Sequence, residues 1–383
     1  MAAATEENVE SSASEPEANK LFRMVMKHKG SDLHLKVGLA PAMRLSGVLR
    51  QMQLPTLSET DMERLMFPLL SARQKGILEE TGGVDFAHII FDGAFETRFR
   101  VNLFRQRGRL SLVARRVNTS IPNFEGLGLP PVIAEITQYD QGIILLAGVT
   151  GSGKSTTIAS MLQYINERER MHILTIEDPI EFTFTDDKSI INQREVGIDV
   201  ADWDMALKHA VRQDPDIILV GEMRDHHTFS AAMHAAETGH LVFGTIHASS
   251  APSTIGRLLD LFPRDMHSAL RQSLAFNLKA VVAQKLLPTT KEWAAKGVGR
   301  VPTVEVMRTN PTIRKLILTE EDTKLGDAIR IGKEEGMQDF TESLRRLCVE
   351  EKIERATAFE VAPSVEILKM ALKGITIAQP GIL

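Results

Sequence analysis

The feature that most constrains this chain is a glycine-rich loop between an apolar run and a segment of helical character. Residues 148–155 read GVTGSGKS and fill every required position of the phosphate-binding P-loop pattern. The apolar run 142–147 precedes the loop as a buried strand would, and residues 156–162 follow it as a helix would. A Gly/Ser-rich loop that only resembles the pattern is the alternative, but the flanking strand and helix favour a nucleotide site.

The residues of this loop have the chemistry that a nucleotide requires. The glycines permit a tight turn that brings backbone N–H groups onto phosphate oxygens, and the following helix N-terminus adds partial positive charge. Lys154 would reach the β- and γ-phosphates, and the Ser155 hydroxyl would ligate Mg²⁺. The sequence therefore predicts ATP and Mg²⁺ as cofactors, and it predicts these binding residues: Gly148, Thr150, Gly151, Ser152, Gly153, Lys154, Ser155 and Thr156.

The composition is that of an ordinary globular protein. At 383 residues, with 43% hydrophobic and 25% charged residues, the chain is long enough for two or three domains. Its net charge of −5 gives no electrostatic argument for nucleic-acid binding, so no nucleic-acid partner is expected. The single cysteine, Cys348, excludes internal disulfides and a multi-cysteine zinc site.

The hydropathy pattern gives no reason to expect a membrane segment. No apolar run approaches the ~18 residues that a membrane-spanning helix needs. The N-terminus is rich in glutamate, where a signal peptide would place basic residues followed by an apolar core. We therefore expect no transmembrane segment and a cytoplasmic protein that reaches a membrane only through partners.

Local patterns also divide the chain into segments. The first residues are mostly Ala, Ser and Glu with little to bury. A short helix near 21–26 and an alternating strand over 31–37 begin the folded part, and the pattern becomes mainly helical after about residue 285. We expect a disordered acidic tail (1–19), an N-terminal domain (20–120), a Gly/Pro-rich linker (121–135) and an ATPase domain with C-terminal helices (136–383).

A hairpin in the N-terminal domain gathers arginines. Residues 95–103 alternate between apolar and polar, residues 106–108 make the turn, and residues 110–117 return as the second strand. A charged solvent face is the simpler interpretation of any single arginine. A P-loop enzyme nevertheless needs cations for the charge that develops on the phosphoryl group, and another domain or subunit often supplies them.

Two acidic stretches indicate hydrolysis rather than nucleotide binding alone. The apolar strand 172–176 ends in three carboxylates around a proline: Glu177, Asp178 and Glu181. Strand ends beside a P-loop are where a water-orienting carboxylate would sit. A second strand, 217–220, leads to Glu222 in a Walker-B-like pattern, although Gly221 stands where an Asp is usual.

Two histidines lie at the ends of a further short strand. His240 precedes residues 241–246 and His247 follows them. A neutral imidazole there could hydrogen-bond phosphate or sense its loss. By spacing alone, a structural role is the more common one for either histidine.

These stretches together resemble the secretion ATPase superfamily. Residues 173–182 look like its Asp box, residues 214–225 like its atypical Walker B motif, and residues 237–247 like its His box. Further motifs resemble the branch of PilT-type type IV pilus retraction ATPases, and the similarity runs from about residue 21 to 372. These motifs lie at residues 31–35, 98–102, 192–196 and 313–317.

The resemblance implies an α/β fold, with a RecA-like P-loop NTPase core, a smaller N-terminal α+β PAS-like domain and a helical C-terminal region. It implies a homohexameric motor with ATP bound between domains and between subunits, acting on an inner-membrane pilus platform protein from a peripheral position. Glu181 is then the catalytic glutamate, and Glu222 is the Walker B acid and, with Ser155, a Mg²⁺ ligand. His240 and His247 are the His box pair, and Arg100 and Arg115 are the expected arginine fingers, with Arg98 as the alternative.

Other functions stay open at this point. An accessory retraction motor, or the ATPase of a type II secretion or pilus assembly system, is the same-class alternative. Extension ATPases generally carry a four-cysteine zinc module and a further N-terminal domain, and the single cysteine argues against that class. A low-activity nucleotide-binding scaffold and a nucleic-acid translocase are the alternatives from different classes.

Overall fold

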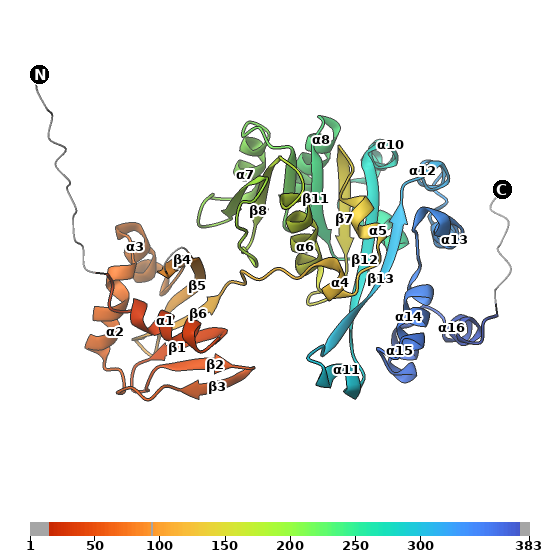
Figure 1. Ribbon diagram of the computed structural model, residues 1–383. Coiled ribbons are helices and arrows are strands. Elements are labelled where there is room, and N and C mark those ends of the chain that lie inside the picture. The colour runs from red at the N-terminus through yellow and green to blue at the C-terminus, as the bar shows by residue number, and fades with distance from the viewer. Residues whose placement is uncertain (1–14, 93–94, 376–383) are drawn as a thin grey trace, which may run out of the picture. The chain divides into compact units, whose positions relative to one another are not determined.

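The computed structural model describes residues 15–92 and 95–375 and divides into two compact units, Met1–Asn118 and Thr119–Leu383 (Figure 1). The expected tail lies mostly outside the described residues. Its expected end at residue 19 falls within folded structure, because Ala18 and Asn19 are buried and the first helix begins at Asn19. None of the helices in residues 15–92 and 95–375 combines the length and the apolar character needed to span a bilayer.

In its described residues, the first unit is an antiparallel sheet with three α-helices. Its strands lie in the order β3-β2-β1-β6-β5-β4, and every neighbouring pair is antiparallel. The helices are α1 (Asn19–Lys27), α2 (Glu59–Met66) and α3 (Ala72–Thr81). The strands are β1 (Asp32–Lys36), β2 (Ala42–Leu45), β3 (Val48–Gln51), β4 (Gly83–Asp92), β5 (Phe95–Gln106) and β6 (Arg109–Arg116).

The predicted hairpin is confirmed and forms the centre of this unit. Strands β5 and β6 pair in antiparallel register, and Arg107 and Gly108 make the connection with φ angles of 52° and 75°. Both angles lie in the left-handed region, as a two-residue hairpin turn of the favoured twist requires. The alternation that predicted the strands places Phe99 and Val101 in the core, both fully buried.

The second unit is built on a seven-stranded sheet in the order β13-β12-β7-β11-β10-β8-β9. All neighbouring strands are parallel except the pair β12 and β13. In Figure 1, β7 runs between β11 and β12 at the centre of the sheet. The strands are β7 (Gly142–Ala147), β8 (His172–Glu177), β9 (Ile190–Glu195), β10 (Ile217–Val220), β11 (Leu241–Ile246), β12 (Leu278–Pro288) and β13 (Arg300–Arg308).

Helices cover both faces of this sheet, which explains why the P-loop strand is apolar throughout. Alternate residues of β7 enter two different cores: Ile144 and Leu146 pack with α6, whereas Ile143 and Leu145 pack with α8 and α10. The helices are α4 (Phe124–Leu127), α5 (Val132–Ile136), α6 (Lys154–Asn166), α7 (Trp203–Ala210), α8 (His226–Glu237), α9 (Ala251–Leu259), α10 (His267–Asn277), α11 (Lys291–Ala295), α12 (Pro311–Leu318), α13 (Leu325–Ile331), α14 (Phe340–Val349), α15 (Arg355–Val361) and α16 (Val365–Leu372).

The expected linker differs from the structure, and the helical C-terminal region includes one strand that was not expected. Segment 121–135 contains α4 and most of α5, and its Leu129 and Ile133 belong to the core that α6 covers. These apolar residues bury enough surface to fold the segment onto the sheet despite its glycines and prolines. Strand β13 was not expected because Pro302 and Glu305 interrupt its apolar pattern, although both lie in a paired antiparallel edge strand.

Glu305 is a buried carboxyl group that joins two helices to this edge of the sheet. The side chain is 6% exposed, and its Oε2 accepts a hydrogen bond of 2.6 Å from the backbone N–H of Ala251, the first residue of α9. The N–H of Phe340, the first residue of α14, also hydrogen-bonds the carboxyl group. Burial raises the pKa of Glu305 to about 7, and these backbone hydrogen bonds only partly offset it.

This raised pKa makes the stability of the protein depend on pH in a specific direction. In the unfolded chain the Glu305 carboxyl ionises near pH 4.5, whereas in the fold it keeps its proton up to about pH 7. The free energy of unfolding of the wild type, relative to Glu305→Gln, should therefore fall between pH 4.5 and 7, by up to ~3 kcal/mol, and stay level above that range. Urea unfolding of both proteins across this range measures the difference.

The exposed Glu360 on α15 provides the control, because Glu360→Gln removes a carboxyl group without opening a buried site. Its stability profile should run parallel to that of the wild type. Parallel profiles for Glu305→Gln as well would show that the buried carboxyl does not titrate as described.

Candidate functional site

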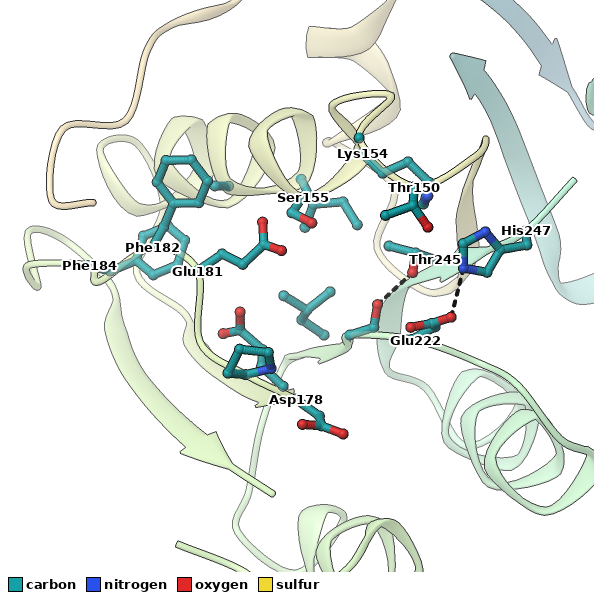
Figure 2. A pocket seen from close by; sticks show the side chains of 17 residues that line it. Thr150, Lys154, Ser155, Asp178, Glu181, Phe182, Phe184, Glu222, Thr245 and His247 are labelled. Carbon is teal, nitrogen blue, oxygen red and sulfur yellow. Dashed lines mark hydrogen bonds and ion pairs between the residues drawn. The ribbon is translucent and has the colours of Figure 1, made fainter. Parts of the chain in front are cut away.

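A pocket lies at the edge of the sheet where the parallel strands β7, β8, β10 and β11 end. The register pairs Ile246 with Ala147, and Val220 with both Ile176 and Gly244, so the loops after these strands emerge side by side. The P-loop, the three-carboxylate segment, the Walker-B-like segment and His247 therefore all contribute to one cavity (Figure 2). Its lining includes Thr150, Gly151, Lys154, Ser155, Glu177, Asp178, Glu181, Phe182, Glu222, Thr245 and His247.

The P-loop has the shape that a phosphate group requires. Gly148 and Gly153 have φ angles of 154° and 91°, and a Cβ atom at either position would come within about 2.6 Å of Gln284 on β12. Only glycine fits these positions without displacing the Gln284 backbone, at Gly148, or the Gln284 side chain, at Gly153. The Ser152 hydroxyl is buried without a hydrogen-bond partner among the described residues, and α6 begins at Lys154, so its first N–H groups face the loop. These residues fit a nucleotide phosphate.

The remaining predicted loop residues lie around this turn. Gly153 and Thr156 line a neighbouring cavity on the other side of the loop, together with Thr157 and Trp293. Residues of the loop therefore line two cavities, one bordered by acidic residues and one bordered by Trp293.

Lys154 is a nearly buried cation that the loop itself holds. Its side chain is 9% exposed, and Nζ donates hydrogen bonds to the backbone oxygens of Gly148 at 2.8 Å and Val149 at 3.1 Å. Burial lowers the pKa of Lys154, while the carboxylates of Glu222 and Glu181 act in the opposite direction. The ammonium group is thus fixed where a phosphate oxygen would replace or join its carbonyl partners.

Glu222 is held from two sides. Its Oε2 lies 2.6 Å from a guanidinium nitrogen of Arg224. Its Oε1 lies 2.8 Å from Nε2 of His247, as Figure 2 shows. The hydrogen bond from Arg224 is the main reason that the pKa of Glu222 is lowered, so the carboxylate is charged at neutral pH. The preceding Gly221 stands where an Asp is usual, and a Cβ there would make a tight contact of 3.1 Å with the backbone oxygen of Ile176.

Glu177, the last residue of β8, and Asp178 and Glu181 in the loop that follows have different surroundings. Glu181 is exposed and points into the pocket from the side opposite Glu222 (Figure 2). Glu177 instead accepts hydrogen bonds from the Thr175 hydroxyl at 2.7 Å and the Gln193 amide at 3.2 Å. Burial raises the pKa of Glu177 to about 7, so this group stays largely neutral below that pH. Of the two, Glu181 is therefore the carboxylate that is open to solvent and substrate.

His240 does not reach this pocket within the described unit. Its Nδ1 lies 2.9 Å from the backbone oxygen of Ala235, at the end of α8. The whole of β11 separates it from His247, which is a distance of ~20 Å for six strand residues. The structure therefore places the two predicted histidines at opposite edges of the sheet.

Arg100 and Arg115 belong to the first unit and lie directly opposite each other on β5 and β6. Both are exposed, and Nε of Arg115 donates a 2.9 Å hydrogen bond to Oδ1 of Asp32. Burial alone would raise the pKa of Asp32, but hydrogen bonds from Ser31 and Arg115 outweigh it and lower the pKa. This arrangement presents two neighbouring cations on one face of the sheet.

Sequence reasoning missed the partners that orient the acidic residues. It assigned no role to Arg224, which pairs with Glu222, or to Thr245, whose hydroxyl donates a 2.6 Å hydrogen bond to the Gly221 oxygen. Thr245 could have been noticed as a polar residue near the end of an apolar strand. For Arg224 the available signal was its position two residues after the Walker B acid.

Comparisons with known proteins agree with this geometry. Residues 8–351 match the family described as Type II/IV secretion system protein. The Pseudomonas aeruginosa protein named Type IV pilus retractation ATPase PilT is 40% identical over 343 residues, which cover 90% of this chain and 97% of that protein. From the same organism, the Type IV pilus ATPase PilU is 35% identical over 357 residues, covering 93% of this chain and 91% of that protein.

A solved structure shows the same fold. The crystal structure of the pilus retraction motor PilT with bound ADP aligns with a TM-score of 0.83 and 39% sequence identity. The alignment covers 93% of this chain and 99% of that one.

Proposed function

This chain belongs to the type II/IV secretion system protein family and is one of its ATPases, and from that premise we propose that it powers the retraction of type IV pili. The observation that carries the proposal is the convergence of Lys154, Glu181 and Glu222 on one pocket below a complete P-loop. The similarity to a retraction ATPase over nearly the whole of both chains supports a role of this ATPase in pilus disassembly and twitching motility.

Each residue of the pocket has a distinct role in the proposed hydrolysis. The loop N–H groups and the Lys154 ammonium bind the phosphates, and Glu181 accepts the proton of the attacking water. Mg²⁺, held by Ser155 and Glu222, would neutralise phosphate charge when bound. His247 keeps the Glu222 carboxylate in place through its 2.8 Å contact.

The motor is proposed to be a homohexamer in the cytoplasm, attached peripherally to the inner membrane through a pilus platform protein. Closure of the N-terminal unit when ATP binds, and its reversal after hydrolysis, would supply the mechanical step. Arg100 and Arg115 are proposed to act as arginine fingers on a bound nucleotide, and His240 to serve a contact outside the pocket described above. The two compact units, which divide between Asn118 and Thr119, are proposed as the two moving parts.

An accessory retraction motor is the second candidate, because the chain is also similar to the pilus ATPase PilU over most of its length. Both candidates use the same chemistry and differ in whether retraction is lost completely without this protein. A type II secretion or pilus assembly ATPase, a low-activity scaffold and a nucleic-acid translocase remain the outcomes that the experiments below would reveal.

Substitutions in the pocket should separate binding from hydrolysis. We expect Lys154→Ala to lose both ATP binding and turnover, because it removes the cation of the loop. Glu181→Gln should retain ATP binding while turnover falls by ~10²-fold or more, because the amide cannot accept the proton of water. Steady-state ATPase assays with Mg²⁺ and equilibrium ATP binding measure the two effects. Unchanged turnover in Glu181→Gln would remove Glu181 from the role of base.

The arginine pair should affect turnover more than the fold. Replacing Arg100 or Arg115 by Ala is expected to lower kcat by ~10³-fold if that residue stabilises the charge of the transferred phosphoryl group. The exposed Arg109, at the start of β6, is the matched control, and Arg109→Ala should keep wild-type turnover. If neither Arg100→Ala nor Arg115→Ala lowers kcat, the cations are supplied by other residues.

Deletion of the gene in its host distinguishes the pilus functions. For a retraction motor we expect surface pili to be retained or increased while twitching is lost. Complementation with wild-type protein should restore twitching, whereas Lys154→Ala should not. Absence of surface pili after deletion would instead indicate assembly, and ATPase activity stimulated by DNA at physiological salt would favour a translocase.

A further inference from the structure

Gln284 on β12 is a buried polar side chain that contacts both the P-loop and the first turn of α6. It is 3% exposed, and it follows the buried apolar residues 280–283 of the same strand. Nε2 donates a 2.8 Å hydrogen bond to the backbone oxygen of Ser152, and Oε1 accepts a 2.9 Å hydrogen bond from the Thr157 hydroxyl. One amide group therefore joins the turn of the loop to the first turn of α6.

The hydrogen-bond partners fix the orientation of this amide. The Ser152 carbonyl oxygen can only accept, so the NH₂ group of Gln284 must face it. The oxygen of the amide then faces the Thr157 hydroxyl, which can donate. Both contacts are buried, and breaking either would leave an unpaired polar group inside the protein.

The contact to Ser152 controls a group that a phosphate would use. The peptide bond between Ser152 and Gly153 is trans, because the one cis bond of the described chain is Asp178–Pro179. In a trans peptide the N–H points away from the C=O. By holding the Ser152 oxygen on the β12 side, Gln284 directs the Gly153 N–H away from β12.

The close approach of strand and loop supports this function. The last register pair between β12 and β7 joins Ala283 to Ala147, so Gln284 lies beside Gly148 where β7 ends. A Cβ on Gly153 would come within 2.6 Å of the Gln284 amide nitrogen. The glycines thus allow the loop to rest directly on this side chain.

We propose that Gln284 is a positioning residue that holds the P-loop in its phosphate-binding shape from the neighbouring strand β12. It touches no phosphate itself and acts through the Ser152–Gly153 peptide and through Thr157. This inference rests on the nucleotide binding that the proposed function requires, and it adds a residue from a different strand to the site.

Titration of ADP into the full-length protein, followed by calorimetry, tests the proposal. Gln284→Met keeps the size of the side chain and removes both hydrogen bonds, and we expect the Kd for ADP to rise about tenfold or more. Thr157→Val removes only the bond to Oε1, so its Kd should rise by about threefold. In ATPase assays the KM of Gln284→Met should rise similarly, while kcat changes less.

A half-buried amide in the same unit provides the matched control. Nε2 of Gln338 donates a 2.7 Å hydrogen bond to the oxygen of Val304, which pairs with Gln284 on the neighbouring strand, and this bond does not involve the P-loop. Gln338→Met should lower the thermal unfolding midpoint of the nucleotide-free protein and leave the Kd for ADP unchanged. A merely structural role for Gln284 predicts this same result for Gln284→Met, and that outcome would overturn the proposal.

The remaining outcomes are also decisive. If Gln284→Met does not fold, Thr157→Val alone decides, since a wild-type Kd in that variant contradicts the network. If the wild type binds no ADP, the proposed motor function fails. If the wild type and both variants bind ADP equally, only the role of Gln284 fails.

Discussion

The parallel register of β7, β8, β10 and β11 is the constraint on which the site depends. Parallel strands bring their carboxyl ends to one edge of the sheet. Strand pairing alone therefore brings together loops that are far apart in the sequence. The pairing of Ile246 with Ala147, and of Val220 with Ile176, fixes to within one residue the positions at which the loops leave the sheet. A shift of one residue in any strand would turn its side chains to the opposite face and move its acid out of the pocket.

Burial then gives similar residues different chemistry. Glu177 and Glu222 both follow apolar strands, yet burial raises the pKa of the first to about 7, whereas hydrogen bonding to Arg224 keeps the second ionised. Hydrogen bonds from Thr175 and Gln193 hold the Glu177 side chain in a fixed position in the lining of the pocket. Glu181 and Asp178 are exposed, and Glu181 points into the pocket from the side opposite Glu222, where it can meet water.

The parts of the fold with strong local signals could be predicted from the sequence. Gly142–Ala147 is a continuous apolar run and forms β7, and the alternating hairpin of the first unit forms β5 and β6. The remainder depends on tertiary contacts that no local pattern records. Leu129 and Ile133 fold a Gly/Pro-rich segment because α6 is there to cover them, and Gln284 is oriented by a loop more than 130 residues away. The local sequence does not show which of His240 and His247 belongs to the site. They lie at opposite ends of β11, and of the two His247 lines the pocket.

Charge balance explains why this pocket cannot be the whole site. Among the residues that line it in the described part of the chain, Lys154 is the one permanent cation, and it faces the acids Glu177, Asp178, Glu181 and Glu222. Arg224 already neutralises Glu222, so it offers little to a ligand. A nucleoside triphosphate adds several negative charges, and like charges at such distances repel strongly in a partly buried pocket. A divalent cation and further positive side chains from outside this cavity would offset that charge. Arg100 and Arg115, which we propose as arginine fingers, are exposed cations on the first unit and are one candidate source of it.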